Sequence, residues 1–194
     1  MIIGITGGTG CGKTTALAAV RQLGGMVLDC DAIYHDLLKT DKALLGQIDR
    51  TFPGVVEGGI LDRKKLGNIV FNDAKMLSTL NEITHKRVKE AVLEQLKNKN
   101  DLVAIDAVAL FESGLNALCD VTVAITAPED MRIQRIMARD GISFAYAKSR
   151  IDAQPSQDAF AEKCDYILEN DTTEADFHSK CIAFYKELAI MELT

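Results

Sequence analysis

Four residues near the start of the chain have the types and the spacing of a phosphate-binding loop. Gly7, Gly12, Lys13 and Thr14 fit the pattern G-x-x-x-x-G-K-[ST]. Glycines allow the backbone to approach phosphate oxygens, and the N–H groups that begin the following helix point at those oxygens. Lys13 can reach the β- and γ-phosphates of a nucleotide, and the Thr14 hydroxyl can bind Mg²⁺. The pattern therefore predicts a nucleotide site whose contacts come from Gly10, Cys11, Gly12, Lys13, Thr14 and Thr15.

The neighbouring sequence distinguishes this pattern from a chance glycine-rich turn. Residues 1–6 are largely apolar and β-branched, which predicts a buried parallel strand. Residues 16–20 are alanine, leucine and valine, and they favour a helix. A strand, a glycine loop and a helix in this order are the context in which the pattern holds phosphate.

Acidic residues follow two further predicted strands. Asp29 and Asp31 come directly after the strand 26–28, and Asp106 ends the strand 102–106. Ligands of open parallel sheets bind at the carboxyl ends of the strands, so these carboxylates are candidates for catalysis or metal binding. Asp31 could instead only cap the helix that follows it, and Asp106 could only cap a turn. We expect at least one of the first pair to be catalytic, and Asp106 to hold Mg²⁺ through water.

Arginines share one face of a helix that is predicted to begin near residue 129. Arg132, Arg135 and Arg139 are spaced by three and four residues. Such a run is usually a solvated face, and acidic residues interrupt this one. Arg139 lies just before Gly141, where a hinged lid could begin, and Arg150 lies near the end of the next short helix.

Cys11 lies inside the predicted loop and admits two interpretations. The start of a helix and the charge of Lys13 both favour the thiolate, which would make Cys11 easily oxidised or alkylated. Alternatively, Cys11 is only a small residue that fits the loop, and we prefer this interpretation. The five cysteines contain no C-x-x-C pair and the three histidines match no metal motif, so neither a zinc site nor a disulfide framework is predicted.

The remaining sequence supplies the elements that would position these residues. Two more strands are predicted at 121–125 and 166–170, and the alternation of strands with helices predicts a parallel sheet covered by helices on both faces. Residues 32–100 look helical and are too many for a simple crossover, so they predict a helical insert that forms one wall of a substrate cleft. The last helix has an apolar stripe of Phe177, Cys181, Phe184 and Leu188.

The bulk properties exclude several classes of protein. The 194 residues carry a net charge of −6, which argues against broad binding to nucleic acid. No apolar run reaches the roughly 18 residues that a membrane helix needs, and no signal segment precedes the first strand. We therefore expect a cytoplasmic protein with a small-molecule substrate, and no obligate protein partner is evident.

Taken together, these segments resemble the dephospho-CoA kinase family over nearly the whole chain. The chain departs from the family pattern at Lys86 and Val108, where the family usually has proline. The segments that carry the resemblance occur in the family's order, and they are 4–14, 29–31, 59–66, 70–71, 83–85, 110–114, Arg135, Arg139-Asp140, Arg150, Gln154, 164–165 and 167–170.

The resemblance implies an α/β, P-loop kinase fold with a five-stranded parallel sheet flanked by helices, a helical insert and a small lid. It implies a nucleotide-binding core of residues 1–31, 101–138 and 160–194, a helical CoA-substrate domain of residues 32–100, and a lid of residues 139–159. The implied reaction is ATP-dependent phosphorylation of the ribose 3′-hydroxyl of dephospho-CoA, which gives CoA and ADP and is the last step of coenzyme A biosynthesis. The implied cofactors are ATP and Mg²⁺.

The candidate residues then take specific roles. Asp31 would orient the acceptor hydroxyl and take its proton, with Asp29 as the alternate. Lys13, Arg139 and Arg150 would stabilise charge on the transferring group. The metal ion would be served by Thr14 and Asp106, and the resemblance implies that Asn170 borders the adenine.

Two other functions compete with this one. A nucleoside monophosphate kinase would differ in its acceptor, and a P-loop switch would act through a partner. The segment 98–101 resembles the N-K-x-D guanine signature of such switches. It follows a charged helix rather than a buried strand, so we interpret it as a polar turn.

Overall fold

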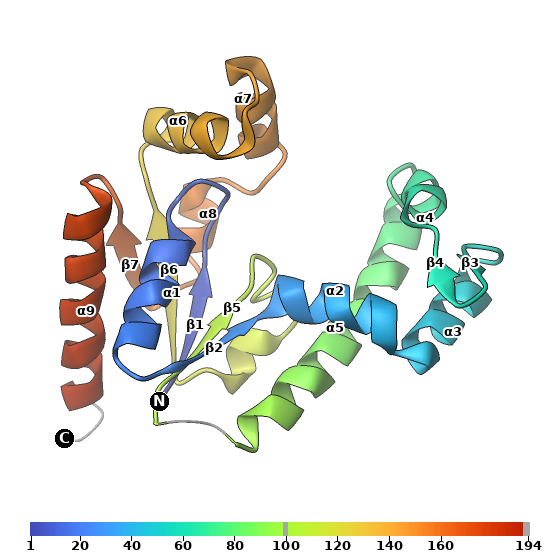
Figure 1. Ribbon diagram of the computed structural model, residues 1–194, viewed down its shortest axis with the longest axis horizontal. Helices are drawn as coiled ribbons and strands as arrows, with labels where there is room; N and C mark the ends of the chain where they lie inside the picture. The colour runs from blue at the N-terminus through green and yellow to red at the C-terminus, as the bar shows by residue number, and fades with distance from the viewer. Residues whose placement is uncertain (99–100, 192–194) are drawn as a thin grey trace. The chain divides into compact units, whose positions relative to one another are not determined.

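The computed structural model describes residues 1–98 and 101–191 (Figure 1). Lys99 and Asn100, which belong to the predicted polar turn, lie outside the described residues. The strands in this part of the chain are β1 (Ile2–Thr6), β2 (Met26–Asp29), β3 (Val56–Glu57), β4 (Ile60–Leu61), β5 (Val103–Asp106), β6 (Val121–Thr126) and β7 (Tyr166–Glu169). The helices there are α1 (Lys13–Gln22), α2 (Cys30–Thr40), α3 (Lys42–Thr51), α4 (Arg63–Val70), α5 (Ala74–Leu96), the 3₁₀ helix η1 (Leu115–Leu118), α6 (Glu129–Asp140), α7 (Phe144–Asp152), α8 (Gln157–Ala161) and α9 (Glu174–Met191).

The main sheet has five strands in the order β2-β5-β1-β6-β7. The central strand β1 pairs in parallel with β5 and β6, and β6 pairs in parallel with β7. All five predicted strands are therefore confirmed, together with the parallel sheet. Ile5 of β1 lies opposite Asp106 of β5, so the β5 aspartate lies at the sheet edge where the nucleotide loop begins.

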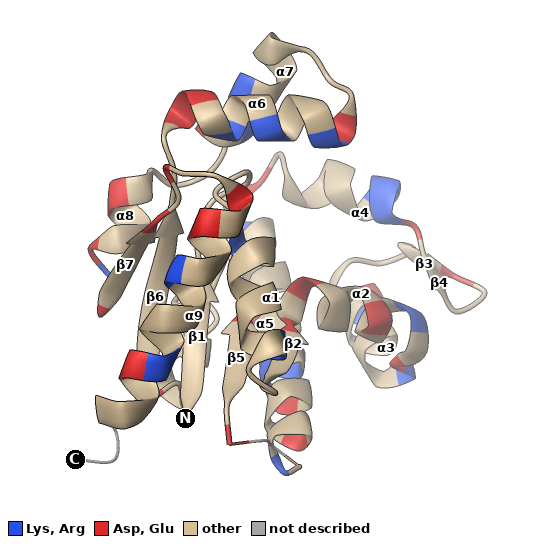
Figure 2. Ribbon diagram, turned by 60° about the vertical axis from the view of Figure 1, so that its left-hand side comes forward, with Lys and Arg blue, Asp and Glu red and all other residues tan. Residues whose placement is uncertain are grey.

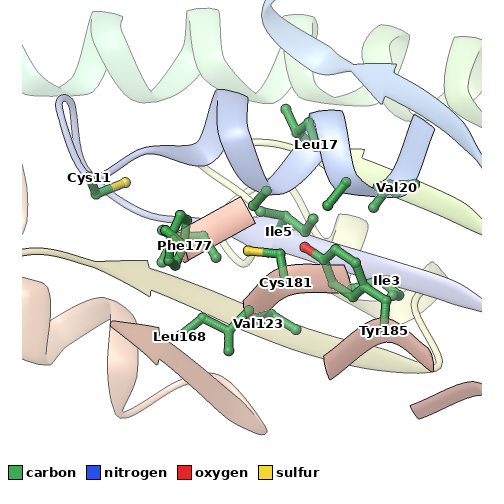
Figure 3. Packing of buried hydrophobic residues seen from close by; sticks show 14 of the residues in the cluster. Ile3, Ile5, Cys11, Leu17, Val20, Val123, Leu168, Phe177, Cys181 and Tyr185 are labelled. Carbon is green, nitrogen blue, oxygen red and sulfur yellow. The ribbon is translucent and has the colours of Figure 1, made fainter. Parts of the chain in front are cut away.

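The core beside this sheet is built from β1, α1 and α9. All five residues of β1 are buried. Figure 3 shows Phe177, Cys181 and Tyr185 of α9 among side chains of the strands. Tyr185 is buried and Phe184 is only partly buried, so the predicted apolar stripe of α9 is shifted by one residue at this turn.

The chain divides into two compact units, of which the first is Met1–Leu28 with Lys99–Thr194 and the second is Asp29–Asn98. The second unit consists of α2 to α5 and the antiparallel hairpin β3-β4. The 23-residue helix α5 packs against α2, α3 and α4, around a separate apolar cluster that includes Leu44, Ile48 and Phe52.

The second unit is less uniformly helical than the sequence predicts. The antiparallel strands β3 and β4 interrupt the helices, and Gly58 and Gly59 in the turn between them have φ of 58° and 81°. Both values lie in the region that favours glycine. Among the described residues, no helix is long and apolar enough to cross a membrane.

Candidate active site

The predicted phosphate-binding loop joins β1 to α1 and has the expected backbone. Gly10 and Gly12 have φ of 78° and 99°, which L-residues with a side chain rarely adopt. Gly12 is the N-cap of α1 and has no side chain with which to cap the helix. The start of α1 therefore has no side-chain cap, although the Thr15 N–H donates to Gly12 O at 3.1 Å, and the helix dipole favours an anion there.

The carbonyl groups of the loop are held by side chains around it. Lys13 Nζ donates to Gly7 O at 3.0 Å. Arg135 Nη1 donates to Gly10 O at 3.4 Å, and Asn170 Nδ2 donates to Cys11 O at 2.9 Å. A peptide group is planar and trans, so a carbonyl that faces one way turns the next N–H the other way. These contacts therefore fix the direction of loop amides before any anion binds.

Asn170 lies directly beside the loop. Its side chain is 3% exposed, and its Oδ1 accepts from Arg135 Nη2 at 3.1 Å. Its backbone N–H donates to Thr126 O at 2.8 Å, which secures the end of β7 against β6. The Asn170 amide thus supports the loop backbone, a role that the sequence did not suggest. A place beside the adenine remains a prediction.

Cys11 is buried, with 1% of its surface exposed. Burial raises the pKa of the Cys11 thiol, and the nearby charges of Lys13 and Arg132 only partly oppose this effect. The hypothesis of an easily formed thiolate is therefore wrong. The preferred interpretation is that Cys11 is a small residue that fits the loop. Its Sγ packs closely against Gly7, since a Cβ placed on Gly7 would lie only 3.0 Å from that sulfur atom.

Thr14 and Asp106 offer oxygen atoms of the kind that Mg²⁺ prefers. Thr14 is in the first turn of α1, and Asp106 is close enough to the loop that its charge raises the pKa of Cys11. No group of three His, Cys, Asp or Glu that could hold a metal is present in the described part of the chain. Mg²⁺ commonly uses only one or two carboxylates together with substrate phosphates, so this donor set fits it.

The two carboxylates after β2 have different local roles. Asp29 is the N-cap of α2, and its Oδ1 accepts from Ala32 N at 2.9 Å. Asp31 lies in the first turn of the same helix with an exposed side chain. The alternative in which Asp31 caps the helix is therefore wrong, because α2 begins two residues earlier than predicted and Asp29 occupies the capping position.

The structure brings Arg139 and Arg150 to one carboxylate. Arg139 Nε and Nη2 donate to Asp140 at 2.7 and 2.9 Å, and Arg150 Nη1 donates to the same carboxylate at 2.5 Å. The hydrogen bond from Arg139, with that from Arg150, lowers the pKa of Asp140 to about 2. Gly141 ends α6 in the left-handed conformation, with φ of 65°, and lets the chain turn back so that these residues meet.

The sequence placed Asp140 in the family pattern and among the acidic residues beside the arginines, but it did not predict that Asp140 binds two of them. Figure 2 shows acidic residues at both ends of α6 and basic residues between them. Arg132 and Arg135 of that basic run are held at the loop, whereas Arg139 is exposed and pairs with Asp140. The run is therefore only in part a solvated face.

Comparisons with known proteins identify the family of this chain. The sequence model of the family described as dephospho-CoA kinase matches residues 1–176. A dephospho-CoA kinase from Moorella thermoacetica is 39% identical over 174 residues, which are 86% of this chain and 82% of that protein.

Solved structures of similar fold and sequence are known as well. The crystal structure of TT1252 from Thermus thermophilus has a TM-score of 0.80 and 32% identity, and the match covers 100% of this chain and 98% of that one. A dephospho-CoA kinase from Campylobacter jejuni has a TM-score of 0.68 and 30% identity, and the match covers 98% of both chains. With its P-loop kinase fold and its loop formed as described, the chain belongs to the dephospho-CoA kinase family of phosphate-transferring enzymes.

Proposed function

We propose that this kinase transfers the γ-phosphoryl group of ATP to the ribose 3′-hydroxyl of dephospho-CoA and releases CoA and ADP. The observation that carries the proposal is the family match over residues 1–176, which includes the nucleotide loop and the arginine helix α6. The reaction needs only small molecules as partners.

The nucleotide would be held by the loop. Amides from Gly10 to Thr15 contact the phosphates, and Lys13 exchanges its bond to Gly7 O for phosphate oxygens. Arg139 and Arg150 stabilise charge that develops on the transferring group. Their shared carboxylate, Asp140, keeps the two guanidinium groups together on the lid before the nucleotide arrives.

A Mg²⁺ ion would be bound by the Thr14 hydroxyl and, through water, by Asp106. When bound, it neutralises charge on the phosphates and orients them. Thr14 supplies an oxygen from the helix start, and Asp106 supplies a carboxylate from the end of β5.

Asp31 would orient the 3′-hydroxyl and accept its proton late in the transfer, since phosphoryl transfer has a loose transition state. The support is that Asp29 is already engaged as the cap of α2, whereas the Asp31 side chain is exposed in the first turn. Asp29 remains the alternate base.

The unit Asp29–Asn98 would bind the acceptor, as proposed for residues 32–100. It contains a pocket of about 240 Å³ whose lining is mostly apolar and includes Tyr34, Leu66 and Phe71 together with Arg63. The pantetheine arm of the acceptor is largely uncharged and its pyrophosphate is anionic, so apolar side chains beside one arginine suit it. Residues 139–159 would act as the lid.

A panel of acceptors tests the proposal. Purified protein is given ATP and Mg²⁺ with dephospho-CoA, with a nucleoside monophosphate or with no acceptor, and ADP release is followed. Release that depends on dephospho-CoA is the expected result. Equal or faster release with the monophosphate would instead identify a nucleotide kinase, and release that no acceptor changes would favour a P-loop switch.

A further inference from the structure

Thr9, in the nucleotide loop, is held on both sides by side chains from outside the loop. Its N–H donates to Gln154 Oε1 at 2.7 Å. Its carbonyl accepts from Arg132 Nε at 2.9 Å. Arg132 belongs to α6, and Gln154 lies two residues beyond the end of α7. Two consecutive peptide groups of the loop are therefore fixed by side chains from α6 and from the segment after α7.

These two bonds determine the direction of particular loop amides. The carbonyl of Thr9 and the N–H of Gly10 belong to one planar trans peptide group, so they point in opposite directions. Fixing Thr9 O with Arg132 thus aims the Gly10 N–H, which is one of the amides proposed to hold phosphate. The Thr9 N–H is already used by Gln154, which fixes the preceding peptide group.

The surroundings of the Arg132 side chain do not indicate that it stabilises the folded protein. Its side chain is 3% exposed, and Nη2 is buried without a hydrogen-bond partner among the described residues. None of the ion pairs found within those residues includes Arg132. Burial lowers the pKa of the Arg132 guanidinium, and the charge of Glu129 opposes this effect only in part. A buried guanidinium with no direct ion pair costs free energy, so its place here needs another reason.

The loop is shaped to admit this side chain. A Cβ placed on Gly8 would lie 2.5 Å from Arg132 Nη2 and 3.2 Å from Gln154 Oε1. A Cβ on Gly10 would lie 2.8 Å from Arg132 O. Glycine at position 8 therefore leaves room for the two side chains that reach Thr9, and glycine at position 10 leaves room for the backbone of α6 beside the loop.

We propose that Arg132 and Gln154 are positioning residues for the nucleotide, which act by holding the two peptide groups of Thr9 and so set the affinity of the loop for ATP. This inference rests on the proposed function only in taking ATP as the ligand of the loop.

Two variants separate the bond to Thr9 from the charge of Arg132. In Arg132→Gln, the amide nitrogen stands at the same number of bonds from Cα as Nε, so a donor to Thr9 O is kept and the charge is lost. In Arg132→Met, the side chain is as long as that of the glutamine variant, but both the donor and the charge are lost. A role through Thr9 predicts that the glutamine variant retains affinity and the methionine variant does not.

A matched pair tests Gln154. Gln154→Met removes the acceptor for Thr9 N–H and keeps the length of the side chain. Gln157→Met is the control, because Gln157 Oε1 accepts from a backbone amide, Ala127 N, at the same 2.7 Å but does not bond to the loop.

The measurement is calorimetric titration of ATP into each purified variant without acceptor, alongside thermal unfolding. We expect about tenfold weaker binding for Arg132→Met and Gln154→Met, the effect of losing one good hydrogen bond, with melting temperatures close to that of the unaltered protein. Arg132→Gln and Gln157→Met should bind ATP within about twofold of the unaltered protein.

Either of two results would overturn the inference. Equal loss of affinity in Arg132→Gln and Arg132→Met would mean that the charge, rather than the bond to Thr9, matters. Equal behaviour of Gln154→Met and Gln157→Met would mean that the Thr9 bond has no special effect. A protein that binds ATP but does not phosphorylate dephospho-CoA would contradict the proposed function, whereas the titration would still decide these positioning roles.

Discussion

At the scale of single residues, the Lys13 side chain has a fixed position beside the nucleotide loop and carries the positive charge that we propose to bind the phosphates. Its Nζ is 3.0 Å from Gly7 O, so the side chain lies folded along the loop. We predict that Lys13→Ala folds normally and loses about 10² to 10³ in kcat, since a charge aimed at the transferring phosphate is removed. Steady-state ADP release and circular dichroism check this. Near-normal turnover would show that the loop does not hold the reacting phosphates.

Asp31 is the residue that we propose as the base for the acceptor hydroxyl. Asp31→Asn keeps the shape of the side chain but cannot accept a proton. We predict that kcat with dephospho-CoA falls by about 10² or more while ATP binding stays nearly intact. Turnover and calorimetric ATP affinity, measured on the same preparation, separate the two effects.

Asp29→Asn is the matched comparison, and the structure gives a reason for its milder effect. Asparagine caps a helix about as well as aspartate, so α2 should keep its start and the enzyme should keep most of its turnover. An inactive Asp29→Asn with an active Asp31→Asn would exchange the two roles. Two active variants would place the base elsewhere.

At the scale of elements, α6 and α7 bring Arg139 and Arg150 together at Asp140. We predict that Arg150→Ala lowers kcat much more than it weakens ATP binding, because its contact with phosphate forms chiefly in the transition state. Lys148→Ala is the control on the same helix, since Lys148 pairs with Glu129 and Asp152 and should leave kcat unchanged. A change confined to nucleotide affinity would refute the role of Arg150.

The same contacts determine the pH at which Asp140 loses its charge and its pairing with Arg139 and Arg150. The pKa of Asp140 is lowered to about 2, whereas an ordinary aspartate titrates near pH 4. The stabilising effect of its pairing with the arginines is therefore fully present above about pH 4 and is lost as the pH falls through about 2. Because the pair is exposed, its effect on stability is small. We expect nuclear magnetic resonance to show the Asp140 carboxyl ionised down to about pH 3. Titration near pH 4 would contradict the pairing.

The five main strands could be predicted because each is a short apolar run with β-branched residues, and the loop could be predicted because its glycines have fixed spacing. The hairpin β3-β4 could not, since two-residue strands are too short to show an alternation. The start of α2 was misplaced because two aspartates stand within three residues and either can cap.

The contacts that shape the site were beyond sequence reasoning for a different reason. Thr9 meets Gln154 and Arg132 across 145 and 123 residues of chain. Arg150 reaches Asp140 only because Gly141 reverses the chain. No local sequence pattern predicts such long-range contacts, which depend on how α6 and α7 pack beside the loop.

At the scale of the whole molecule, the core beside the sheet contains one polar group that contributes no bond. Tyr185 is 1% exposed, and its hydroxyl has no hydrogen-bond partner among the described residues. We predict that Tyr185→Phe leaves the free energy of unfolding unchanged or raises it by about 1 kcal/mol, because a buried unsatisfied hydroxyl is removed. Chemical denaturation measures this, and a loss of about 2 kcal/mol would mean that the hydroxyl has a partner, such as a buried water.

The proposed reaction phosphorylates one hydroxyl of dephospho-CoA, the ribose 3′-hydroxyl. The direct measurement is phosphorus nuclear magnetic resonance of the product made from dephospho-CoA, ATP and Mg²⁺. The γ-phosphate signal of ATP should be replaced by a phosphomonoester coupled to the ribose H3′ proton, in equal amount to the ADP formed. A phosphate on any other oxygen, or inorganic phosphate alone, would contradict the claim.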